Sequence, residues 1–379
     1  MHPNEILFYK PYLSQEAMQI VPDALKPTNS LFKGKYYNLN RQFIKEMYRP
    51  QEAVFTSSCT DALHMASLLL KLGPDDEVII PSYTFPSVAN VFVNRGIRIR
   101  LADSLAHHPN LDAEHARTLI NDKTRAIIFM CYGGQAEGIE AAAKLVKDTG
   151  IFLIEDAAHS FASNHHGALL GNIGDAGAFS FHESKPVSCG QGGMLLINNP
   201  ALLADWKSVA SHGTNKWQLD EGMASEYNWT SLGAEFNLSE LNHALLYSQL
   251  HEAALLQTQR QKLWYQYYEQ LEELCKVHLE FPLLTFPGSN FYIFYILTRN
   301  KEERKQLIAF LKSEKIQTAF HYTGLHRSDY YLKHFQSIHL PQADNFSDRL
   351  LRLPLYPELA PEAIDRVSDS IKRFYNKVL

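Results

Sequence analysis

Cysteine is scarce in this sequence, and its few copies are dispersed. The 379 residues include four cysteines, at positions 59, 131, 189 and 275, and no two of them form a Cys-x-x-Cys pair. This spacing disfavours a structural zinc cluster and a disulfide scaffold, and it indicates the reduced thiols of a cytoplasmic protein.

Long hydrophobic runs are also missing. The apolar runs at 126–132, 151–154 and 194–197 have the length of β-strands, whereas a membrane-spanning helix needs about 20 apolar residues. Residues 1–12 do not combine a cationic start with an apolar run, as a signal peptide does. We therefore expect a cytoplasmic protein that contacts no membrane.

Basic and acidic residues occur in nearly equal numbers. Lys and Arg number 36 against 41 Asp and Glu, which gives a formal net charge of −5 at pH 7. Such a balance provides no broad basic surface for nucleic acid or an anionic membrane, so any phosphate must be bound by a local site. With 45% apolar and 20% charged residues, the composition is that of a folded globular protein.

Strands and helices are expected to alternate over the first two thirds of the chain. Short apolar runs predict buried strands, and amphipathic segments between them predict helices. This order is typical of an α/β protein with a mostly parallel, doubly wound sheet. The expected strands are 77–81, 97–101, 126–130 and 151–155, and the expected helices are 60–72, 87–95, 111–120 with Asn110 as N-cap, and 139–149.

A different pattern begins after residue 193. One or two long helices are expected over 238–273, followed by alternating segments at 291–297 and 318–322 around a helix at 302–312. We therefore predict a large domain over residues 1–240. Residues 241–379 are expected to form a connecting helix and a smaller α+β domain.

Polar and aromatic residues follow several predicted strands, where the ligands of open parallel sheets bind. Residues 56–61 are mostly small and hydroxylated and precede a helix, so they could bind a phosphate or form an ordinary N-cap. Residues 81–86 include aromatics that could stack on a planar ligand or belong to the core. Asp156 and His159 follow another strand and could serve a ligand, a metal or only a loop.

Lys185 stands between an apolar strand and the glycine-rich segment 190–193. A lone lysine is most often a surface residue, but burial among aromatic neighbours would lower the pKa of Lys185 and allow it to form a Schiff base. A phosphate-type turn, an aromatic residue, a strand-end aspartate and a lysine, in this order, are the parts that bind pyridoxal phosphate. The acid would keep the pyridine nitrogen of that cofactor protonated.

Several segments resemble the DegT/StrS family of nucleotide-sugar aminotransferases, and within it the transaminases that form dTDP-4-amino-4,6-dideoxyhexoses. The resemblance implies an α/β protein with fold type I of the pyridoxal-phosphate enzymes, which is aspartate aminotransferase-like. It also implies a homodimer with shared active sites. The matching segments are 81–85, 155–159, 179–185, 190–193, 212–215 and 320–322.

The resemblance assigns roles to individual residues. Lys185 would carry the cofactor and act as general base and acid, and Asp156 would pair with the pyridine nitrogen. No metal site is expected. The other cofactor contacts would be Thr60, the backbone of Asp61, Phe85, His159, Ser180 and Asn237 of the partner subunit. The candidate contacts to the nucleotide sugar are Lys216, Trp217, His321, Tyr322 and His326.

The resemblance also predicts the reaction. L-Glutamate would donate an amino group to dTDP-4-keto-6-deoxyglucose, giving a dTDP-4-amino-4,6-dideoxyhexose and 2-oxoglutarate for lipopolysaccharide O-antigen or another surface polysaccharide. The alternatives are an aminotransferase for a 3-keto sugar or a UDP- or GDP-sugar, a sugar-nucleotide dehydratase, and a non-catalytic regulator that binds pyridoxal phosphate. Lys185 disfavours the dehydratase, in which a histidine replaces the lysine, and it also disfavours the regulator.

Overall fold

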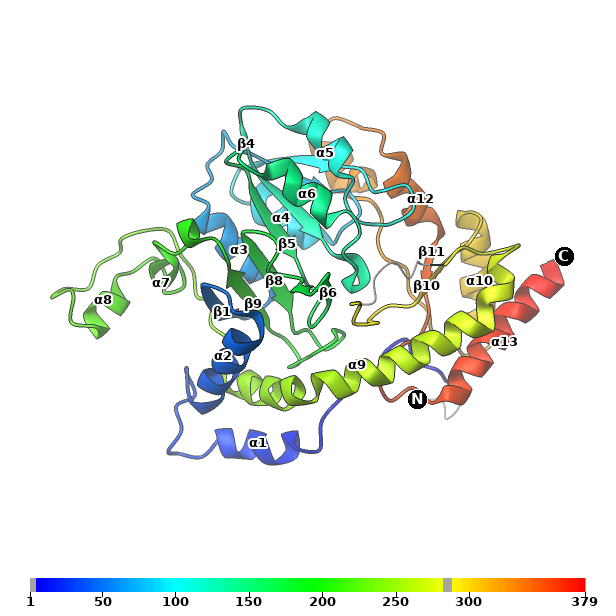
Figure 1. Ribbon diagram of the computed structural model, residues 1–379, viewed down its shortest axis with the longest axis horizontal. Helices are drawn as coiled ribbons and strands as arrows, with labels where there is room; N and C mark the ends of the chain where they lie inside the picture. The colour runs from blue at the N-terminus through cyan, green and yellow to red at the C-terminus, as the bar shows by residue number, and fades with distance from the viewer. Residues whose placement is uncertain (1–4, 282–287, 379) are drawn as a thin grey trace.

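The computed structural model describes residues 5–281 and 288–378. At its centre lies a seven-stranded sheet in which β9 runs against its two neighbours and the other strands share one direction (Figure 1). The predicted mostly parallel sheet is confirmed. In spatial order the strands are β1 (Glu52–Thr56), β9 (Gly193–Ile197), β8 (Ala176–Ser180), β5 (Phe152–Asp156), β4 (Thr124–Met130), β2 (Glu77–Pro81) and β3 (Arg98–Ala102).

Helices cover both faces of this sheet because successive strand residues are apolar and point to opposite sides. In β2, Val78 and Ile80 pack on one face with α3 and α4, whereas Ile79 packs on the other with α5 and α6. All three side chains are fully buried. The helices are α3 (Cys59–Leu69), α4 (Pro86–Val93), α5 (Ala113–Leu119) and α6 (Ile139–Val146).

A single helix of 36 residues, α9 (Glu240–Cys275), connects the sheet to the C-terminal part of the chain (Figure 1). The Ser239 hydroxyl caps it by accepting a hydrogen bond from the backbone N–H of Asn242. Its first half packs with α2 (Lys35–Tyr48), and its second half packs with α13 (Pro361–Val378). Within the described residues, no helix combines the length and the apolar character needed to span a membrane.

The C-terminal part contains a small antiparallel sheet of β10 (Tyr295–Leu297) and β11 (Leu350–Arg352). An apolar cluster around Trp264 and Phe294 packs this part against α9. The boundary between residues 240 and 241 stays a prediction. The remaining elements are α1 (Ala17–Ala24), β6 (Asn164–His165), β7 (Ala168–Leu169), α7 (Trp206–Val209), α8 (Lys216–Asp220), α10 (Lys301–Ser313), α11 (Asp329–His334), α12 (Pro341–Arg349) and short 3-10 turns at Tyr132–Gly134, Pro200–Leu202 and Leu325–Arg327.

The predicted cap of α5 is wrong. Asp112, not Asn110, caps the helix, because its carboxylate accepts a hydrogen bond of 2.9 Å from the backbone N–H of Glu114. The buried side chain of Asn110 instead donates to the carbonyls of Gln135 and Glu137 at 3.0 and 2.9 Å. Its amide therefore links two loops and is not available to a helix end.

The predicted strands at 291–297 and 318–322 are only partly present. β10 begins at Tyr295, since Phe291 has a left-handed backbone with φ of 54° that a strand cannot contain. In the second segment, Ala319 forms one isolated bridge to Arg352. These residues run as irregular chain beside the sheet edge.

The buried His108 makes the stability of the fold sensitive to acid. Its Nδ1 accepts the backbone N–H of Asn110 at 3.2 Å, and its Nε2 lies 3.1 Å from Oε1 of Gln135. These contacts require a neutral ring with the proton on Nε2. Burial, the dominant influence, lowers the pKa of His108 to about 3 despite the opposing hydrogen bond to Gln135.

We expect the free energy of unfolding to fall between pH 6.5 and pH 3 because of this histidine. In that pH range the histidine at position 108 is protonated in the unfolded chain and neutral in the folded chain. The free energy of unfolding therefore falls by up to about 1.4 kcal/mol for each pH unit of acidification. Urea unfolding of the wild type and of His108→Gln at pH 7.5 and pH 5.5 measures the difference. Equal losses of stability in both proteins would contradict this assignment. Comparing the two cancels the opposite contribution of Glu155, whose pKa burial raises to about 7.

Candidate active site

A cavity of about 820 Å³ opens at the carboxyl ends of β1, β5 and β8. The sheet side of its wall comes from strand ends and the loops that follow them. The C-terminal part of the chain supplies the other side, including Tyr292, His321, Tyr322 and Arg352. The predicted site residues that line this cavity are Thr60, Phe85, Asp156, His159, Ser180, Lys185, His321 and Tyr322.

Asp156 ends β5 inside the cavity wall and is only 4% exposed. Its Oδ1 accepts a hydrogen bond of 3.1 Å from the backbone N–H of Ala158. Burial raises the pKa of Asp156, and the Ala158 N–H and the charge of Lys185 partly oppose that rise. A cationic group beside this carboxylate would stabilise its charged form.

Lys185 lies on the loop that follows β8. Hydrogen bonds within this loop and between the loop and α9 fix its conformation. The backbone N–H of Lys185 donates to the carbonyl of His182 at 2.9 Å, and the carbonyl of Pro186 accepts from Arg260 of α9 at 3.1 Å. Its Nζ lies 5.8 Å from the ring centroid of Tyr292. The half-buried side chain of Lys185 lines the cavity. In the described part of the chain, no carboxylate is within ion-pair distance of its amine.

His159 presents a buried hydrogen-bond donor to the cavity. Its Nδ1 accepts the backbone N–H of Gly133 at 3.2 Å, so the neutral ring carries its proton on Nε2. Burial, followed by the charge of Lys185, holds the pKa of His159 well below its usual value. Nε2 is buried and has no hydrogen-bond partner among the described residues. Such an orphaned donor is expensive unless a ligand supplies an acceptor.

Small residues form the turn between β1 and α3. Ser58 caps the helix by accepting the backbone N–H of Asp61 at 3.1 Å, and its hydroxyl lies 2.8 Å from the Asp61 carboxylate. The N–H of Asp61 is thus already bonded within the turn, whereas Thr60 and Ser180 line the cavity. Gly193 lies against this turn so closely that a Cβ there would be 2.2 Å from the backbone carbon of Ser58.

Aromatic side chains border the cavity. Phe85 is 56% exposed, and its ring centroid lies 6.2 Å from that of Tyr322. Tyr322 packs against Tyr83 at 5.6 Å and against Tyr132 at 6.2 Å. Phe85 is therefore an exposed aromatic surface at the cavity, and it lies next to a tyrosine that buried tyrosines hold in place.

Asp61 and three further predicted contacts do not line the cavity of their own chain. Lys216 and Trp217 belong to α8, which projects from the left edge of the molecule in Figure 1. Lys216 pairs with Asp220 at 2.8 Å, and Trp217 Nε1 donates to the Ser208 hydroxyl at 3.0 Å. The Asn237 amide bonds to the neighbouring Glu235 carboxylate. Their assigned roles stay predictions.

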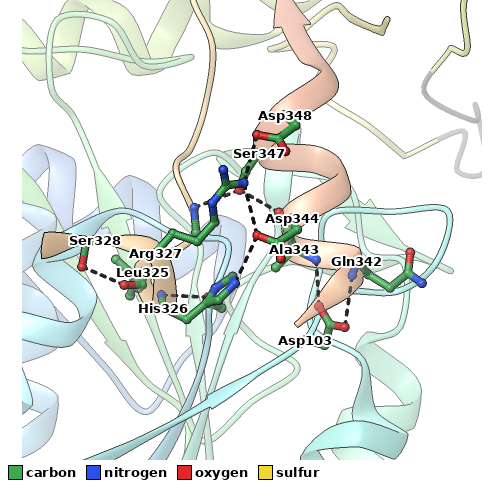
Figure 2. A network of polar contacts seen from close by, with 12 residues as sticks. Asp103, Leu325, His326, Arg327, Ser328, Gln342, Ala343, Asp344, Ser347 and Asp348 are labelled. Carbon is green, nitrogen blue, oxygen red and sulfur yellow. Dashed lines mark hydrogen bonds and ion pairs between the residues drawn. The ribbon is translucent and has the colours of Figure 1, made fainter. Parts of the chain in front are cut away.

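His326 also lies outside the cavity lining and is 4% exposed, within a polar network shown in Figure 2. Its Nδ1 lies 2.7 Å from Oγ of Ser82, and its Nε2 lies 3.2 Å from Asp344. Arg327 contacts the same carboxylate at 3.2 Å, and Asp103 accepts two backbone N–H groups at the start of α12. Ser82 lies in the loop after β2, whereas His326 and Asp344 belong to the C-terminal part of the chain. The network therefore joins these two parts of the protein.

Arg352 and Tyr292 line the cavity but were not identified from the sequence. Arg352 ends β11, and its guanidinium lies 5.4 Å from the ring centroid of Tyr292. Burial raises the pKa of Tyr292, but the charges of Lys185 and Arg352, together with side-chain hydrogen bonds from Arg352 and Ser184, outweigh it and lower the pKa. The available signal was a single arginine within the apolar run 350–355.

One group of side chains elsewhere has the composition of a metal site. Ligand atoms of Glu140, His165 and His166 lie within 4.8 Å of one another on α6 and the β6–β7 hairpin. The Glu140 carboxylate is 2.8 Å from Nε2 of His165 and 3.9 Å from Nε2 of His166. None of the three lines the cavity, so the group has no part in the site described above.

Comparison with known proteins places nearly the whole chain in one family. The model of the DegT/DnrJ/EryC1/StrS aminotransferase family matches residues 11–372. The chain is 30% identical over 383 residues to the spore coat polysaccharide biosynthesis protein SpsC of Bacillus subtilis (strain 168), with 97% of each chain covered.

Two solved structures extend this likeness to three dimensions. The aminotransferase TlmJ from Streptoalloteichus hindustanus matches with a TM-score of 0.90 at 25% identity, over 98% of this chain and 99% of that chain. Helicobacter pylori PseC, an aminotransferase involved in the biosynthesis of pseudoaminic acid, matches with a TM-score of 0.89 at 25% identity, over 98% of this chain and 100% of that chain. The predicted fold type I of pyridoxal-phosphate enzymes is confirmed. The chain belongs to the DegT/DnrJ/EryC1/StrS aminotransferase family, and it is a pyridoxal-phosphate-dependent sugar aminotransferase.

Proposed function

We propose that this enzyme transfers the amino group of L-glutamate to a nucleotide-linked 4-keto-6-deoxyhexose, namely dTDP-4-keto-6-deoxyglucose. The products are dTDP-4-amino-4,6-dideoxyhexose and 2-oxoglutarate. The observation that carries the proposal is the convergence of Lys185, Asp156 and His159 on one cavity. SpsC is a spore coat polysaccharide biosynthesis protein and PseC is involved in the biosynthesis of pseudoaminic acid, which supports a role in a surface polysaccharide.

The cavity residues fit pyridoxal phosphate by their chemistry. Asp156 is a buried carboxylate that accepts one backbone N–H, and a protonated pyridine nitrogen would complete its environment. Nε2 of His159 lacks an acceptor that a ring substituent would provide. Thr60 and Ser180 offer hydroxyls to a phosphate at the N-terminus of α3, and Phe85 offers a face for stacking.

When bound, pyridoxal phosphate supplies an electron-poor ring that accepts electrons from the bond broken at the donor's α-carbon. Asp156 holds the proton on the ring nitrogen. Nζ of Lys185 would hold the cofactor, and as a free amine it would move a proton as general base and acid. The Nε2 proton of His159 orients the ring. The loop attachment of Lys185 to α9 keeps this amine in place while the donor and the sugar exchange.

The proposed functional unit is a homodimer in which Asn237 of the partner subunit reaches the cofactor phosphate. Large apolar side chains are exposed along residues 223–232, where Trp229 is 72% exposed. Exposed apolar patches of this kind mark interfaces between proteins. Light scattering of the purified protein decides this point, because an active monomer would contradict the shared site. The same unit would act in the cytoplasm, away from membranes and nucleic acid.

Product analysis tests the proposed reaction. The purified holoenzyme is incubated with L-glutamate and, separately, with dTDP-4-keto-6-deoxyglucose, its 3-keto isomer, and the UDP- and GDP-linked 4-keto sugars. We expect mass spectrometry to detect an amino sugar and 2-oxoglutarate with the dTDP-4-keto sugar. Preference for a 3-keto, UDP or GDP substrate would overturn the substrate assignment. No amination of any of these sugars would favour a regulator that binds the cofactor.

A further inference from the structure

Glu140, His165 and His166 bring three side chains that can bind a metal ion to one point of the surface. Glu140 lies in the first turn of α6, His165 ends β6, and His166 begins the turn to β7. Within the described residues, no other three His, Cys, Asp or Glu side chains place their ligand atoms this close together. Glu140 stands 25 residues before His165, so the group becomes visible only in the folded chain.

The conformation of the β6–β7 hairpin places both imidazoles on one side. Successive residues of a strand point to opposite faces, yet the ring centroids of His165 and His166 lie 4.3 Å apart. The reason is the two-residue turn of His166 and Gly167, whose positive φ angles of 50° and 87° are those of a type I′ turn. Asparagine followed by glycine is the usual sequence of such a turn. The backbone therefore does not require a histidine at position 166.

The group contains more than a hydrogen-bonded pair. Oε1 of Glu140 lies 2.8 Å from Nε2 of His165, a distance that a hydrogen bond explains. The same oxygen lies 3.9 Å from Nε2 of His166, which is beyond hydrogen-bond range. Neighbouring ligand atoms of a tetrahedral Zn²⁺ are about 3.4 Å apart, between these two distances. The side chains of Glu140 and His166 are 70% and 75% exposed, so they can rotate to that spacing.

We propose that Glu140, His165 and His166 bind one Zn²⁺ ion per chain, outside the active site. Two neutral imidazoles and a carboxylate suit Zn²⁺, whereas Mg²⁺ and Ca²⁺ prefer oxygen ligands alone. Three protein ligands leave one tetrahedral position, which water fills. The side chain of His165 is 8% exposed, so it holds the ion against the hairpin, and Glu140 joins the ion to α6. This site is independent of the proposed reaction, because none of the three residues lines the cavity.

Calorimetric titration of the holoenzyme with Zn²⁺ tests the proposal. We expect one ion to bind per chain, and Mg²⁺ to show no binding at the same concentrations. The Kd for Zn²⁺ should rise by at least about 10- to 100-fold in His166→Asn and in Glu140→Gln, because losing a ligand costs no less than losing a residue that only orients one. Asparagine suits the type I′ turn, so the hairpin should keep its conformation in His166→Asn.

His107→Gln is the matched control. His107 is an exposed histidine 3.5 Å from the Glu137 carboxylate, and it belongs to no group of three ligands in the described chain. Its replacement should leave the Kd for Zn²⁺ unchanged. Circular dichroism shows whether each variant is folded, and the rate of amino transfer by His166→Asn should equal that of the wild type.

Diffraction from crystals soaked in Zn²⁺, measured at the zinc absorption edge, locates the ion. We expect an anomalous peak about 2.0 to 2.2 Å from one atom of each of the three side chains. The absence of saturable Zn²⁺ binding, an unchanged Kd in both variants, or a peak at other residues would overturn the inference. Because these measurements require no turnover, they are decided separately from the proposed amino transfer.

Discussion

Replacing Lys185 by alanine is expected to lower kcat by about 10²- to 10⁴-fold, the range attributed to a catalytic acid and base. The physical reason is that no other amine lines the described cavity, so no neighbouring group can take over the proton transfer or hold the cofactor. Single-turnover measurements with L-glutamate determine the loss. Borohydride reduction followed by peptide mass spectrometry is expected to find the cofactor on Lys185 of the wild type and on no peptide of the variant.

Two further variants show whether chemistry or charge is responsible. Lys185→Arg keeps a cation in the cavity but removes the primary amine, and it should be as inactive as Lys185→Ala. Lys276→Ala is the matched control, because Lys276 is exposed at the end of α9 and its ion pair within the described residues is with the nearby Glu273. Full activity of Lys185→Arg would refute a covalent role for this amine.

The second large effect is expected at Asp156. Replacement by asparagine should lower kcat by about 10²- to 10³-fold, because a preorganised charge in a buried site contributes on this scale and the amide cannot hold the ring nitrogen in its protonated form. The Kd of the cofactor, measured by fluorescence, should rise as well. The overall fold should persist, since the carboxylate accepts one backbone hydrogen bond of 3.1 Å, from the nearby N–H of Ala158, and a long 4.0 Å contact from the Cys59 thiol.

The neighbouring Glu155 provides a matched contrast. Its carboxylate accepts backbone hydrogen bonds of 2.6 to 2.7 Å from Gly171, Ile173 and Gly174, and it is fully buried behind the sheet end. Glu155→Gln should therefore lower the melting temperature and leave the rate per folded enzyme nearly unchanged. A loss of rate at Glu155 that equals the loss at Asp156 would mean that Asp156 acts through structure alone.

Local patterns predicted much of the fold. The strand at 77–81 is present with those bounds, since a short apolar run can be buried only in a sheet covered on both faces. Errors arose where a side chain met a distant partner. Asn110 was predicted as a helix cap, but its amide bonds to carbonyls more than twenty residues away, and no local rule could identify those partners.

The candidate site divides in the same way. Asp156 and Lys185 belong to short motifs in which neighbouring residues carry the information, so the sequence alone selected them as candidates. His326 carried the same kind of signal but is enclosed by Ser82 and Asp344, which are contributed by other segments. Arg352 belongs to no recognised sequence motif, and its place in the cavity lining became visible only in the folded structure.

The sequence by itself determined the alternation of strands and helices, the family, and the lysine and aspartate on which the proposed chemistry depends. These features depend on runs of adjacent residues, so their periodicity and order can be recognised without knowledge of the fold. Only the tertiary structure decided that Lys185 and the buried Arg352 both lie near the ring of Tyr292. The physical reason is that burial and charge pairing are properties of contacts between distant segments, which exist only once the chain has folded.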